Sequence, residues 1–530
     1  MDERSYSELP LLDSQGRSSI PSGRIKTKSK SYLRLSPWTS WKRRFVVFLT
    51  LALIALLTIL WWIDVDRTES ASRLQKSDGR KKHASKKPLA QENMLSKPGE
   101  SVDRGLRYLS YLPHSGFHNQ RIALENALTL AKVLNRTLII PPCILGTAIP
   151  WVEFDKLLNR LRTISSIGFD DCYSEDTEQM VSPRECSSQP HGTFVDWKEI
   201  IDMDEIRKSV NVIERKSFEE DWLFNILGIK NPADKIQQIK EENIYQYKFL
   251  IRPGRKKAGK KVVEQKVELG KFDSSVDVYQ HFGNSDASLI EIGSLFGTSR
   301  LKISNDPLAR QARSGFRRAM VFNNPVLLKL SRRIASQLFH PPIGYLGVHV
   351  RVGDNLFRSH ATETVSTIIS KLLTDHLKLP LSSLQEAILE SDLQDRRRQP
   401  ELISSDRLQM TCRRPKFTKP HLLKFNRPLF LATDSPLPEV EPALATFFKA
   451  FPCTYLLNDF DLLLMKDITL SQDRQVRSNP EIGKLMVPFL DAMVAARATS
   501  FVGTPGSTFS DFVNNVLFQT YHNLPIIEFG

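Results

Sequence analysis

Residues 344–354 read Gly-Tyr-Leu-Gly-Val-His-Val-Arg-Val-Gly-Asp, an apolar run that becomes polar at its end. Such a run is typical of a strand buried on both faces of a parallel sheet. His349 and Arg351 are two residues apart, so a strand directs both side chains to the same side. Ligands of open α/β sheets bind at the carboxyl ends of strands, where an arginine can donate two hydrogen bonds to a phosphate. We therefore predict that Arg351 binds a diphosphate, although a structural histidine beside an Arg351–Asp354 ion pair fits the same pattern.

A similar unit begins the folded part of the chain. Residues 107–112 and 137–141 have the composition of buried strands, and residues 120–134 between them carry apolar side chains at helical spacing. This order of strand, loop, helix and strand predicts a βαβ unit. The loop, residues 113–119, places Gly116 close to the start of the helix, where free backbone N–H groups attract anions.

The last motif of the chain is Gly-Thr-Pro-Gly-Ser-Thr-Phe-Ser, residues 503–510, between a predicted strand and a predicted helix. Small residues at the start of a helix allow backbone N–H groups to bind phosphate oxygens. Thr508 and Asp511 have the spacing of a capping box. A capped helix without a ligand fits this pattern as well, and the loop lacks the lysine of a Walker A motif.

The pattern of the whole folded region predicts an α/β protein with two halves, residues 104–340 and 341–530. The boundary is placed at Pro341–Pro342, where a predicted helix leads into the strand of Arg351. A charged segment, residues 388–420, is predicted to be a loose surface insertion. Further helical patterns cover 151–162, 196–230, 326–339, 363–377 and 482–498, and further strands are predicted at 289–296, 428–434, 454–457 and 500–503.

Residues 45–63 form an uninterrupted apolar run without a charged side chain, long enough for a helix that spans a bilayer. Ten Lys and Arg residues precede the run, and Asp64 and Asp66 follow it. This asymmetry predicts a type II signal-anchor with its amino terminus in the cytosol. Residues 1–44 are then a disordered cytosolic tail, and residues 64–103 are a flexible, polar stem on the other side of the membrane.

Much of the net charge of +15 lies around the predicted membrane anchor rather than on a folded face. Residues 1–103 contain 19 Lys and Arg and 11 Asp and Glu, which gives 19 − 11 = +8 and leaves +7 for the other residues. Because nucleic-acid binding requires a concentrated basic surface, we expect no nucleic-acid partner.

The five cysteines all follow the predicted anchor, in a compartment where disulfides form. Cys172 with Cys186, and Cys412 with Cys453, are the pairs suggested by their positions, although spacing alone does not fix connectivity. The odd number leaves at least one thiol unpaired, and the spacings do not resemble a zinc site.

Together the motifs resemble those of the GDP-fucose protein O-fucosyltransferase superfamily, in the same order. Residues 115–121 (Ser-Gly-Phe-His-Asn-Gln-Arg) and 131–142 are similar to the first motif of the family, and residues 349–354 to its HxRxxD motif. Residues 432–435 (Ala-Thr-Asp-Ser) and 501–510 are similar to its last two motifs. The resemblance covers about residues 105–530.

This resemblance implies a GT-B-like fold, in which two Rossmann-like lobes face a cleft and the C-terminal lobe holds the donor. It also implies an inverting transfer of fucose from GDP-fucose to a hydroxyl, with no metal or other cofactor required. The acceptor implied is a secretory-pathway protein, in the lumen of the Golgi or the endoplasmic reticulum. A glycan hydroxyl as acceptor, and a non-catalytic scaffold that binds a nucleotide-sugar, are the alternatives.

The resemblance also implies roles for individual residues. His349 and Asp354 would support the arginine, and His118 would be either a general base or a spacer, because residues 113–121 contain no carboxylate. The implied catalytic residues are Arg351, Asn119 and His118, and the implied donor-binding residues are Gly116, Phe117, His349, Asp354, Asp434, Ser507, Thr508 and Phe509.

Overall fold

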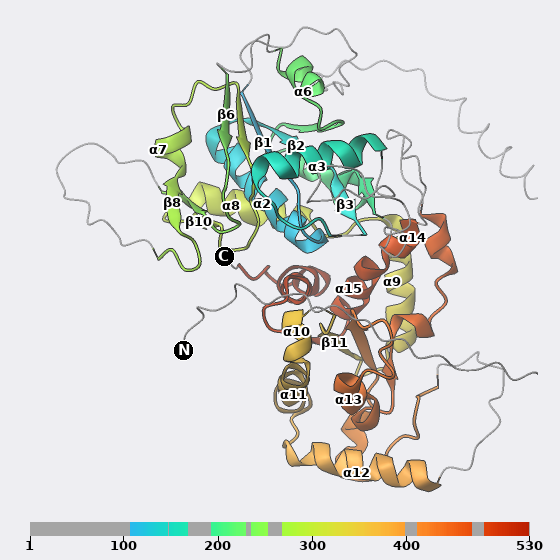
Figure 1. Cartoon of the computed structure of the whole chain (residues 1–530). Helices are drawn as coiled ribbons and strands as arrows, with labels where there is room; N and C mark the ends of the chain where they lie inside the picture. Colours follow the sequence, from blue (N-terminus) through green and yellow to red (C-terminus); the bar gives the residue numbers. More distant parts are fainter. Residues whose placement is uncertain are drawn as a thin grey trace, which may run out of the picture. The chain divides into compact units, whose positions relative to one another are not determined.

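Two parallel sheets organise the described part of the chain, one in each half (Figure 1). The predicted tail, anchor and stem lie outside it, as does the predicted Cys172–Cys186 pair. Within it, no helix is both long and apolar enough to cross a membrane. The structure is a computed structural model that describes residues 107–146, 148–167, 192–228, 235–252, 268–353, 355–397, 411–468 and 482–528, which all belong to one unit by their contacts.

The first half contains the predicted βαβ unit. Strand β1 (Tyr108–Tyr111) leads into helix α2 (Phe117–Leu134), which returns to β2 (Thr137–Ile140), and the two strands pair in parallel. The sheet continues on both sides in the order β5-β2-β1-β9-β6, and every pairing in it is parallel. Its other strands are β5 (Val212–Glu214), β6 (Ile236–Ile239) and β9 (Leu289–Ile292).

Shorter elements surround this sheet, and several differ from the prediction. Residues 196–230, predicted as helical, contain strand β5 between short helices. The first half also contains a smaller, three-stranded parallel sheet of order β10-β7-β8, which the sequence pattern does not predict. The elements are β3 (Cys143–Leu145), α3 (Phe154–Ile167), β4 (Thr193–Val195), η1 (Trp197–Glu199), α5 (Met203–Arg207), α6 (Glu220–Leu227), β7 (Tyr247–Ile251), β8 (Ser274–Asp277), α7 (Val278–Phe282), β10 (Leu301–Ile303) and α8 (Pro307–Ala319).

The second half is built around the predicted strand at residues 344–354, which is β11 (Leu346–Val350). It is an inner strand of a parallel sheet with the order β13-β12-β11-β14. All five of its residues are buried, as the apolar run predicts. The neighbouring strands β12 (Leu429–Thr433), β13 (Thr454–Tyr455) and β14 (Ser500–Gly503) also lie where strands are predicted.

Successive residues of β11 face two different hydrophobic clusters, because side chains alternate along a strand. Leu346, Val348 and Val350 pack in the cluster that includes helix α11 (Ala361–Lys371). The opposite face is covered by helix α15 (Val487–Ala496). This helix lies so close that a Cβ on Gly347 would be 2.4 Å from the carbonyl oxygen of Ala495, so only glycine fits there.

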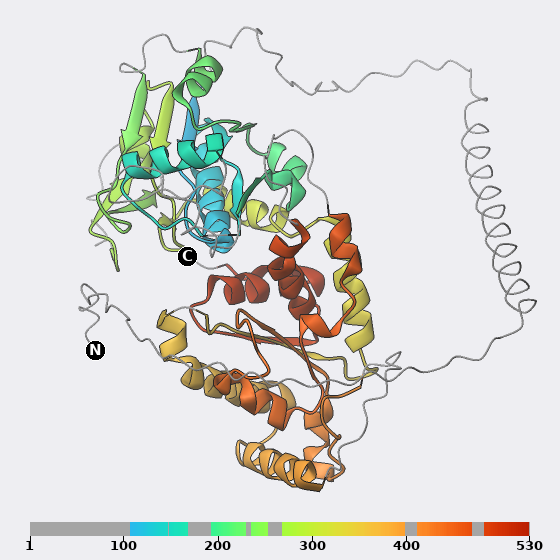
Figure 2. The same ribbon diagram turned by 45° about the vertical axis from the view of Figure 1, so that its right-hand side comes forward.

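Helix α9 (Pro325–Leu338) connects the two halves and packs against α15 (Figure 1). The predicted boundary at residue 340 assigns α9 to the first half, whereas the helix that α9 packs against, α15, belongs to the second half. The view in Figure 2 also shows α9, in yellow, next to the red and orange helices of the second half.

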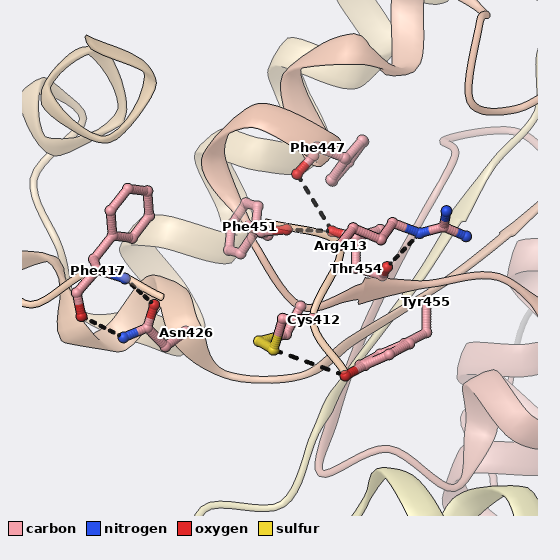
Figure 3. The surroundings of a disulfide bond; sticks show 9 residues. Cys412, Arg413, Phe417, Asn426, Phe447, Phe451, Thr454 and Tyr455 are labelled. Carbon is pink, nitrogen blue, oxygen red and sulfur yellow. Dashed lines mark hydrogen bonds between the residues drawn. A yellow bond between two sulfur atoms is a disulfide. The ribbon is translucent and has the colours of Figure 1, made fainter. Parts of the chain in front are cut away.

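A disulfide joins Cys412 to Cys453, as the sequence suggests (Figure 3). Cys453 directly precedes β13, and Cys412 lies near the start of the segment that follows the undescribed residues 398–410. Next to the bond, the Nε–H of Arg413 donates to the carbonyl of Thr454 at 2.9 Å. Cys143 is a free and fully buried thiol.

The prediction of a loose insertion at 388–420 is wrong for its first part. Helix α12 (Ser382–Arg397) continues to residue 397 (Figure 2), and residues 398–410 lie outside the described part. Ala387 and Ser391 are buried on one face of the helix, and Glu390 and Asp392 form ion pairs with Lys419 and Lys449 of other segments. The other elements of this half are α10 (Asn355–Ser359), η3 (Leu372–Leu377), η4 (Pro420–Asn426), η5 (Pro442–Leu444), α13 (Ala445–Ala450), η6 (Leu457–Asp459), η7 (Leu463–Asp467), α14 (Ile482–Leu485), α16 (Thr508–Phe512), η8 (Val513–Phe518) and α17 (Gln519–Tyr521).

Candidate functional site

Polar residues follow the carboxyl ends of three neighbouring strands in the second sheet. Arg351 follows β11, Asp434 follows β12, and the 503–507 loop follows β14. Since β11 lies between the other two strands, the three segments meet at one edge. This is the edge at which ligands bind in open α/β sheets.

Arg351 is tied to the loop after β14 through its backbone. Its N–H donates to Oγ1 of Thr504 at 2.9 Å, and the Thr504 hydroxyl donates to the carbonyl of His349 at 3.1 Å. The guanidinium lies with its Cζ 4.6 Å from the ring centre of Phe357, and its Nε is 3.8 Å from Oδ2 of Asp434. The side chain keeps 33% of its surface exposed, so the fixed cation remains accessible to a ligand.

Asp434 holds the backbone that follows Arg351. Its Oδ1 accepts the N–H of Val352 at 2.7 Å and the N–H of Gly353 at 3.1 Å. A Cβ on Gly353 would be only 2.7 Å from Oδ2 of Asp434, so glycine permits this approach. Because its oxygens accept these hydrogen bonds, Asp434 positions the Arg351 loop as well as offsetting part of the arginine's charge.

His349 connects β11 to helix α16. Its Nδ1 is 2.7 Å from the hydroxyl oxygen of Ser510, and its ring stacks on Phe509 with 4.2 Å between ring centres. A Cβ on Gly503 would be 2.5 Å from that Ser510 hydroxyl, so the contact requires glycine at this position of β14. Burial, and to a smaller extent the positive charge of Arg351, lowers the pKa of His349 to about 3. The imidazole is therefore neutral at physiological pH.

Helix α16 is capped by Ser507, whose side-chain oxygen accepts the N–H of Ser510. The predicted capping box at Thr508 and Asp511 is wrong by one residue, because Thr508 is already the first helical residue. The N–H groups of Thr508 and Phe509 have no partner among the described residues. They are thus available to an anion, as is usual for the first turn of a helix.

The start of α2 in the first half is built differently. Gly116 is its N-cap residue and provides no side-chain cap, and the first turn contains no acidic residue. The N–H groups of Phe117 and His118 have no partner in the described ranges, and a Cβ on Gly116 would meet no atom within 4 Å. The preceding residue, Ser115, has a positive φ of 65°.

Buried side chains next to this turn fix its shape. The amide nitrogen of Gln120 donates to the carbonyls of Ser115 and Ile144, each at 2.9 Å. His114 lies with Nδ1 and Nε2 each 2.8 Å from a serine hydroxyl, those of Ser115 and Ser294. Burial, followed by the charge of Arg300, lowers the pKa of His114 to about 3.

Helices α2 and α16 bring the two turns into contact. The ring of His118 meets Phe509 edge-on at 5.2 Å, and the Cζ of Arg121 lies 4.2 Å from the ring centre of Phe512. Burial, together with the nearby charges of Arg121, His349 and Arg351, lowers the pKa of His118 well below its usual value. His118 is therefore neutral, and its buried Nδ1 has no hydrogen-bond partner in the described part of the chain.

Arg121 belongs to a buried group of charges behind the turn. Glu125 accepts from Arg313 at 2.9 Å and from Arg317 at 2.8 Å, and its other oxygen is 3.6 Å from Arg121. Three guanidiniums thus surround this one carboxylate. Burial lowers the pKa of Arg121 to about 10, so it remains protonated at neutral pH.

The sequence-predicted residues of the two halves thus lie close together, with different surroundings. Phe117 packs edge-on against Phe489 of α15 at 4.4 Å between ring centres, so its ring is part of the contact between the halves. The side chain of Asn119 is partly exposed and makes no hydrogen bond within the described residues. Asp354 lies outside those residues, so its role stays a prediction.

Four residues of this region have no role in the sequence prediction. Thr504 and Ser510 connect the β14 loop and α16 to β11, and Phe357 contacts the guanidinium of Arg351. Glu241 follows β6 in the first sheet, where its Oε1 accepts the N–H of Ser294, and burial raises its pKa to about 7. The available signal was the position of Thr504 directly after a predicted strand, and that of Ser510 at the end of the 503–510 motif.

No group of three or more His, Cys, Asp or Glu side chains within the described ranges is arranged to hold a metal ion.

The known proteins that this chain resembles include fucosyltransferases. No family model matches the chain. A curated relative, O-fucosyltransferase 30 of Arabidopsis thaliana, is 60% identical over 38 residues, which are 7% of this chain and 8% of the relative. The matched segment is thus less than a tenth of either protein.

Particular solved structures of the same class also resemble the chain. POFUT1 in complex with GDP matches with a TM-score of 0.35 and 12% identity, over 79% of this chain and 96% of that one. The fucosyltransferase NodZ from Bradyrhizobium matches with a TM-score of 0.34 and 14% identity, over 78% of this chain and 94% of that one.

Proposed function

We propose that this protein is a glycosyltransferase that transfers fucose from GDP-fucose to a hydroxyl group of a secretory-pathway protein. The observation that carries the proposal is the placement of Arg351, whose backbone is bonded to the β14 loop and whose guanidinium is exposed at the same sheet edge. An arginine and a helix start at one strand edge form the arrangement that binds a diphosphate. The motif resemblance and the Arabidopsis relative support the choice of donor.

Arg351 and the two helix starts would share the negative charge of the donor. The guanidinium supplies a full positive charge, and the N–H groups of Thr508 and Phe509 supply donors on the same side. The N–H groups of Phe117 and His118 supply donors from the facing turn. These groups stabilise the departing GDP more than the bound sugar nucleotide, because negative charge grows on it as the glycosidic bond breaks.

Transfer would proceed with inversion, through attack by the acceptor hydroxyl on the face opposite to GDP, and without a required metal ion. Such a reaction is driven mainly by departure of the leaving group, so it needs little assistance from a base. His118 is neutral and its low pKa makes it a weak base in the free enzyme. A diphosphate beside it would counter the positive charges that depress this pKa.

We also propose that residues 45–63 anchor the protein in the Golgi or endoplasmic reticulum membrane, with the catalytic region in the lumen. The charge asymmetry around this apolar run supports that orientation. The Cys412–Cys453 disulfide agrees with an oxidising compartment.

Donor binding is tested by the thermal unfolding of the purified full-length protein with increasing GDP. The wild type should be stabilised by about 2–3 kcal/mol at 100 times the dissociation constant. Arg351→Ala should lose most of this shift, whereas Arg310→Ala, which removes an exposed arginine of α8, should retain it. A wild-type protein that is not stabilised by saturating GDP would refute the proposal.

The acceptor is tested by following fucose transfer from GDP-fucose to folded secretory protein domains and to free glycans. Transfer to the protein domains is the expected result. Transfer to glycans alone would identify a sugar hydroxyl as the acceptor. Donor binding without turnover on either would identify a non-catalytic protein.

A further inference from the structure

A cavity of about 270 Å³ lies at the opposite edge of the second sheet from Arg351. One wall is the amino end of β11, where Tyr345 precedes the first strand residue, whereas Arg351 follows the last. The other walls come from α9, the end of α15 and the end of α17. The lining residues that matter here are Arg332, Phe339, Arg497, Tyr521 and His522.

Three polar atoms of this lining are buried and without a hydrogen-bond partner within the described residues. They are Nη2 of Arg497, the hydroxyl of Tyr521 and Nε2 of His522. Buried polar atoms nearly always have a partner, so three such atoms in one cavity need an explanation. All three can donate a hydrogen bond.

The cavity also concentrates positive charge. Arg332 and Arg497 both line it, and none of its described lining residues is acidic. Arg332 makes no ion pair with any described residue. Burial lowers the pKa of Arg497, the neighbouring Tyr521 hydroxyl raises it, and the nearby charge of Arg332 lowers it, so the two guanidiniums repel each other.

The Arg497 side chain is held in place independently of any ligand. Its Nε–H donates to the hydroxyl of Ser331 at 3.2 Å, and its Cζ lies 4.0 Å from the ring centre of Tyr521. These contacts orient the guanidinium and leave Nη2 for another partner. An arginine fixed in this way loses little entropy when it binds an anion.

A second cavity is also lined by basic residues, but its Arg and Lys side chains are paired with acidic residues or backbone carbonyls of the protein. It has a volume of about 360 Å³ and is lined by five Arg and Lys residues of the first half. There Arg207 pairs with Asp204 and Glu214, Lys208 pairs with Glu205, and the Lys132 ammonium donates to a backbone carbonyl. Arg136 likewise donates to three carbonyls, and Arg107 to one of them. Its positive groups therefore have protein partners, and the cavity gives no reason to expect a ligand.

We propose that the cavity between α9, α15 and α17 binds a dianionic phosphate group, carried by a small phosphate monoester or present as inorganic phosphate. Two guanidiniums match the two negative charges of a phosphate better than the single charge of a carboxylate. The Tyr521 hydroxyl and the His522 imidazole add donors to its remaining oxygens. Phe339, which is 46% exposed at the rim, offers an apolar surface to the organic part of a monoester.

The test is a titration of the full-length protein with inorganic phosphate, a hexose phosphate and acetate at constant ionic strength, followed by calorimetry and thermal unfolding. Inorganic phosphate or the hexose phosphate should bind at least ten times more tightly than acetate. Tighter binding of the hexose phosphate identifies a monoester as the ligand, and equal or weaker binding identifies free phosphate. Acetate binding as tightly as phosphate, or no phosphate binding, would overturn the proposal.

Arg332→Gln is the informative variant, because Arg332 is exposed and its loss should leave folding intact. It should weaken phosphate binding at least tenfold, and Tyr521→Phe should weaken it to a smaller extent. Arg310→Gln removes an exposed arginine outside the cavity and should change nothing. Because GDP also carries phosphates, the titration is repeated in Arg351→Ala, where phosphate binding should persist. Loss of binding in Arg351→Ala, with Arg332→Gln unaffected, would assign the phosphate to the strand edge of Arg351 instead and overturn the proposal.

Discussion

The β14–α16 turn and the β1–α2 turn both lead from a buried parallel strand into a helix, yet they are held in different ways. In the first, side chains of the turn and of α16 form the bonds, since Ser507 caps the helix and Thr504 and Ser510 bond to β11. In the second, the N-cap Gly116 offers no side chain, and neighbouring residues such as Gln120 fix the backbone. Both turns leave the N–H groups of their first two helical residues without a partner among the described residues, so the comparison teaches that a side-chain cap fixes the turn without closing it to a ligand.

The largest expected difference concerns the charges that the two turns offer. Arg351→Ala should lower the rate of fucose transfer by about 10²–10³-fold, because it removes the cation nearest to the departing diphosphate. Asn119→Ala should lower it about tenfold, because a neutral amide contributes less than a charged donor. Both rates are measured with GDP-fucose at saturation. An equal loss in the two variants would show that the β1–α2 turn carries as much of the stabilisation as the Arg351 edge.

The same glycine substitution should have unequal effects in the two turns. Gly503→Ala should destabilise the protein by about 1–3 kcal/mol, since its Cβ would be 2.5 Å from the Ser510 hydroxyl. Gly116→Ala should cost less than about 1 kcal/mol, because open space surrounds that position and only a weak cap is lost. Urea unfolding gives both free energies. A larger cost for Gly116→Ala would contradict the packing described for the two turns.

His114 lies in the β1–α2 turn and His349, a residue of β11, contacts helix α16 after the other turn, and both buried histidines should make the protein less stable in acid. The pKa values of His114 and His349 are about 3 in the folded protein, whereas both side chains are protonated near pH 6.5 when unfolded. Unfolding therefore takes up protons as the pH falls below about 6.5, and each histidine should reduce stability by up to about 1.4 kcal/mol per pH unit.

This pH dependence is measured by urea unfolding at several pH values between 6.5 and 4. His114→Gln and His349→Gln should each flatten the slope by about one proton, and the double variant by about two. A single variant that leaves the slope unchanged would show that its imidazole is not held neutral in the folded protein.

The smallest expected change in stability comes from a substitution in the β1–α2 turn that should stabilise the protein while it weakens GDP binding. Gly116→Asp should stabilise α2 by about 0.3–1 kcal/mol, because aspartate caps a helix and interacts favourably with its dipole. It should also weaken GDP binding at least about tenfold, because the new charge repels the diphosphate. Gly116→Asn, which caps without a charge, is the control and should weaken binding less. Unchanged GDP affinity in Gly116→Asp would place the diphosphate away from this turn.

The strands around both turns could be predicted because each is a short apolar run that ends in polar residues. The runs at 107–112 and 500–503 have this form, and strands β1 and β14 lie where the sequence places them. The start of α16 was misplaced by one residue because Ser507 and Thr508 are equally suited to cap a helix. Periodicity alone does not distinguish between them.

The features missed from the sequence depend on contacts between distant residues. Thr504 meets Arg351 across 153 positions, and Glu241 reaches Ser294 across 53, so no local pattern reveals either contact. Helix α12 was missed because its buried face contains small residues such as Ala387 and Ser391, while leucines such as Leu389 are exposed, so its apolar side chains do not mark the buried face. The sheet of β7, β8 and β10 was missed because its strands are short and separated by long connections.

The packing of α9 against α15 determines how this protein can be shortened. A truncated form that starts at Pro341 would lack α9 and expose the apolar surface of α15 that it covers. Such a fragment should aggregate when it is expressed. A fragment that begins at or before Asn324, the residue that caps α9, would keep this surface covered.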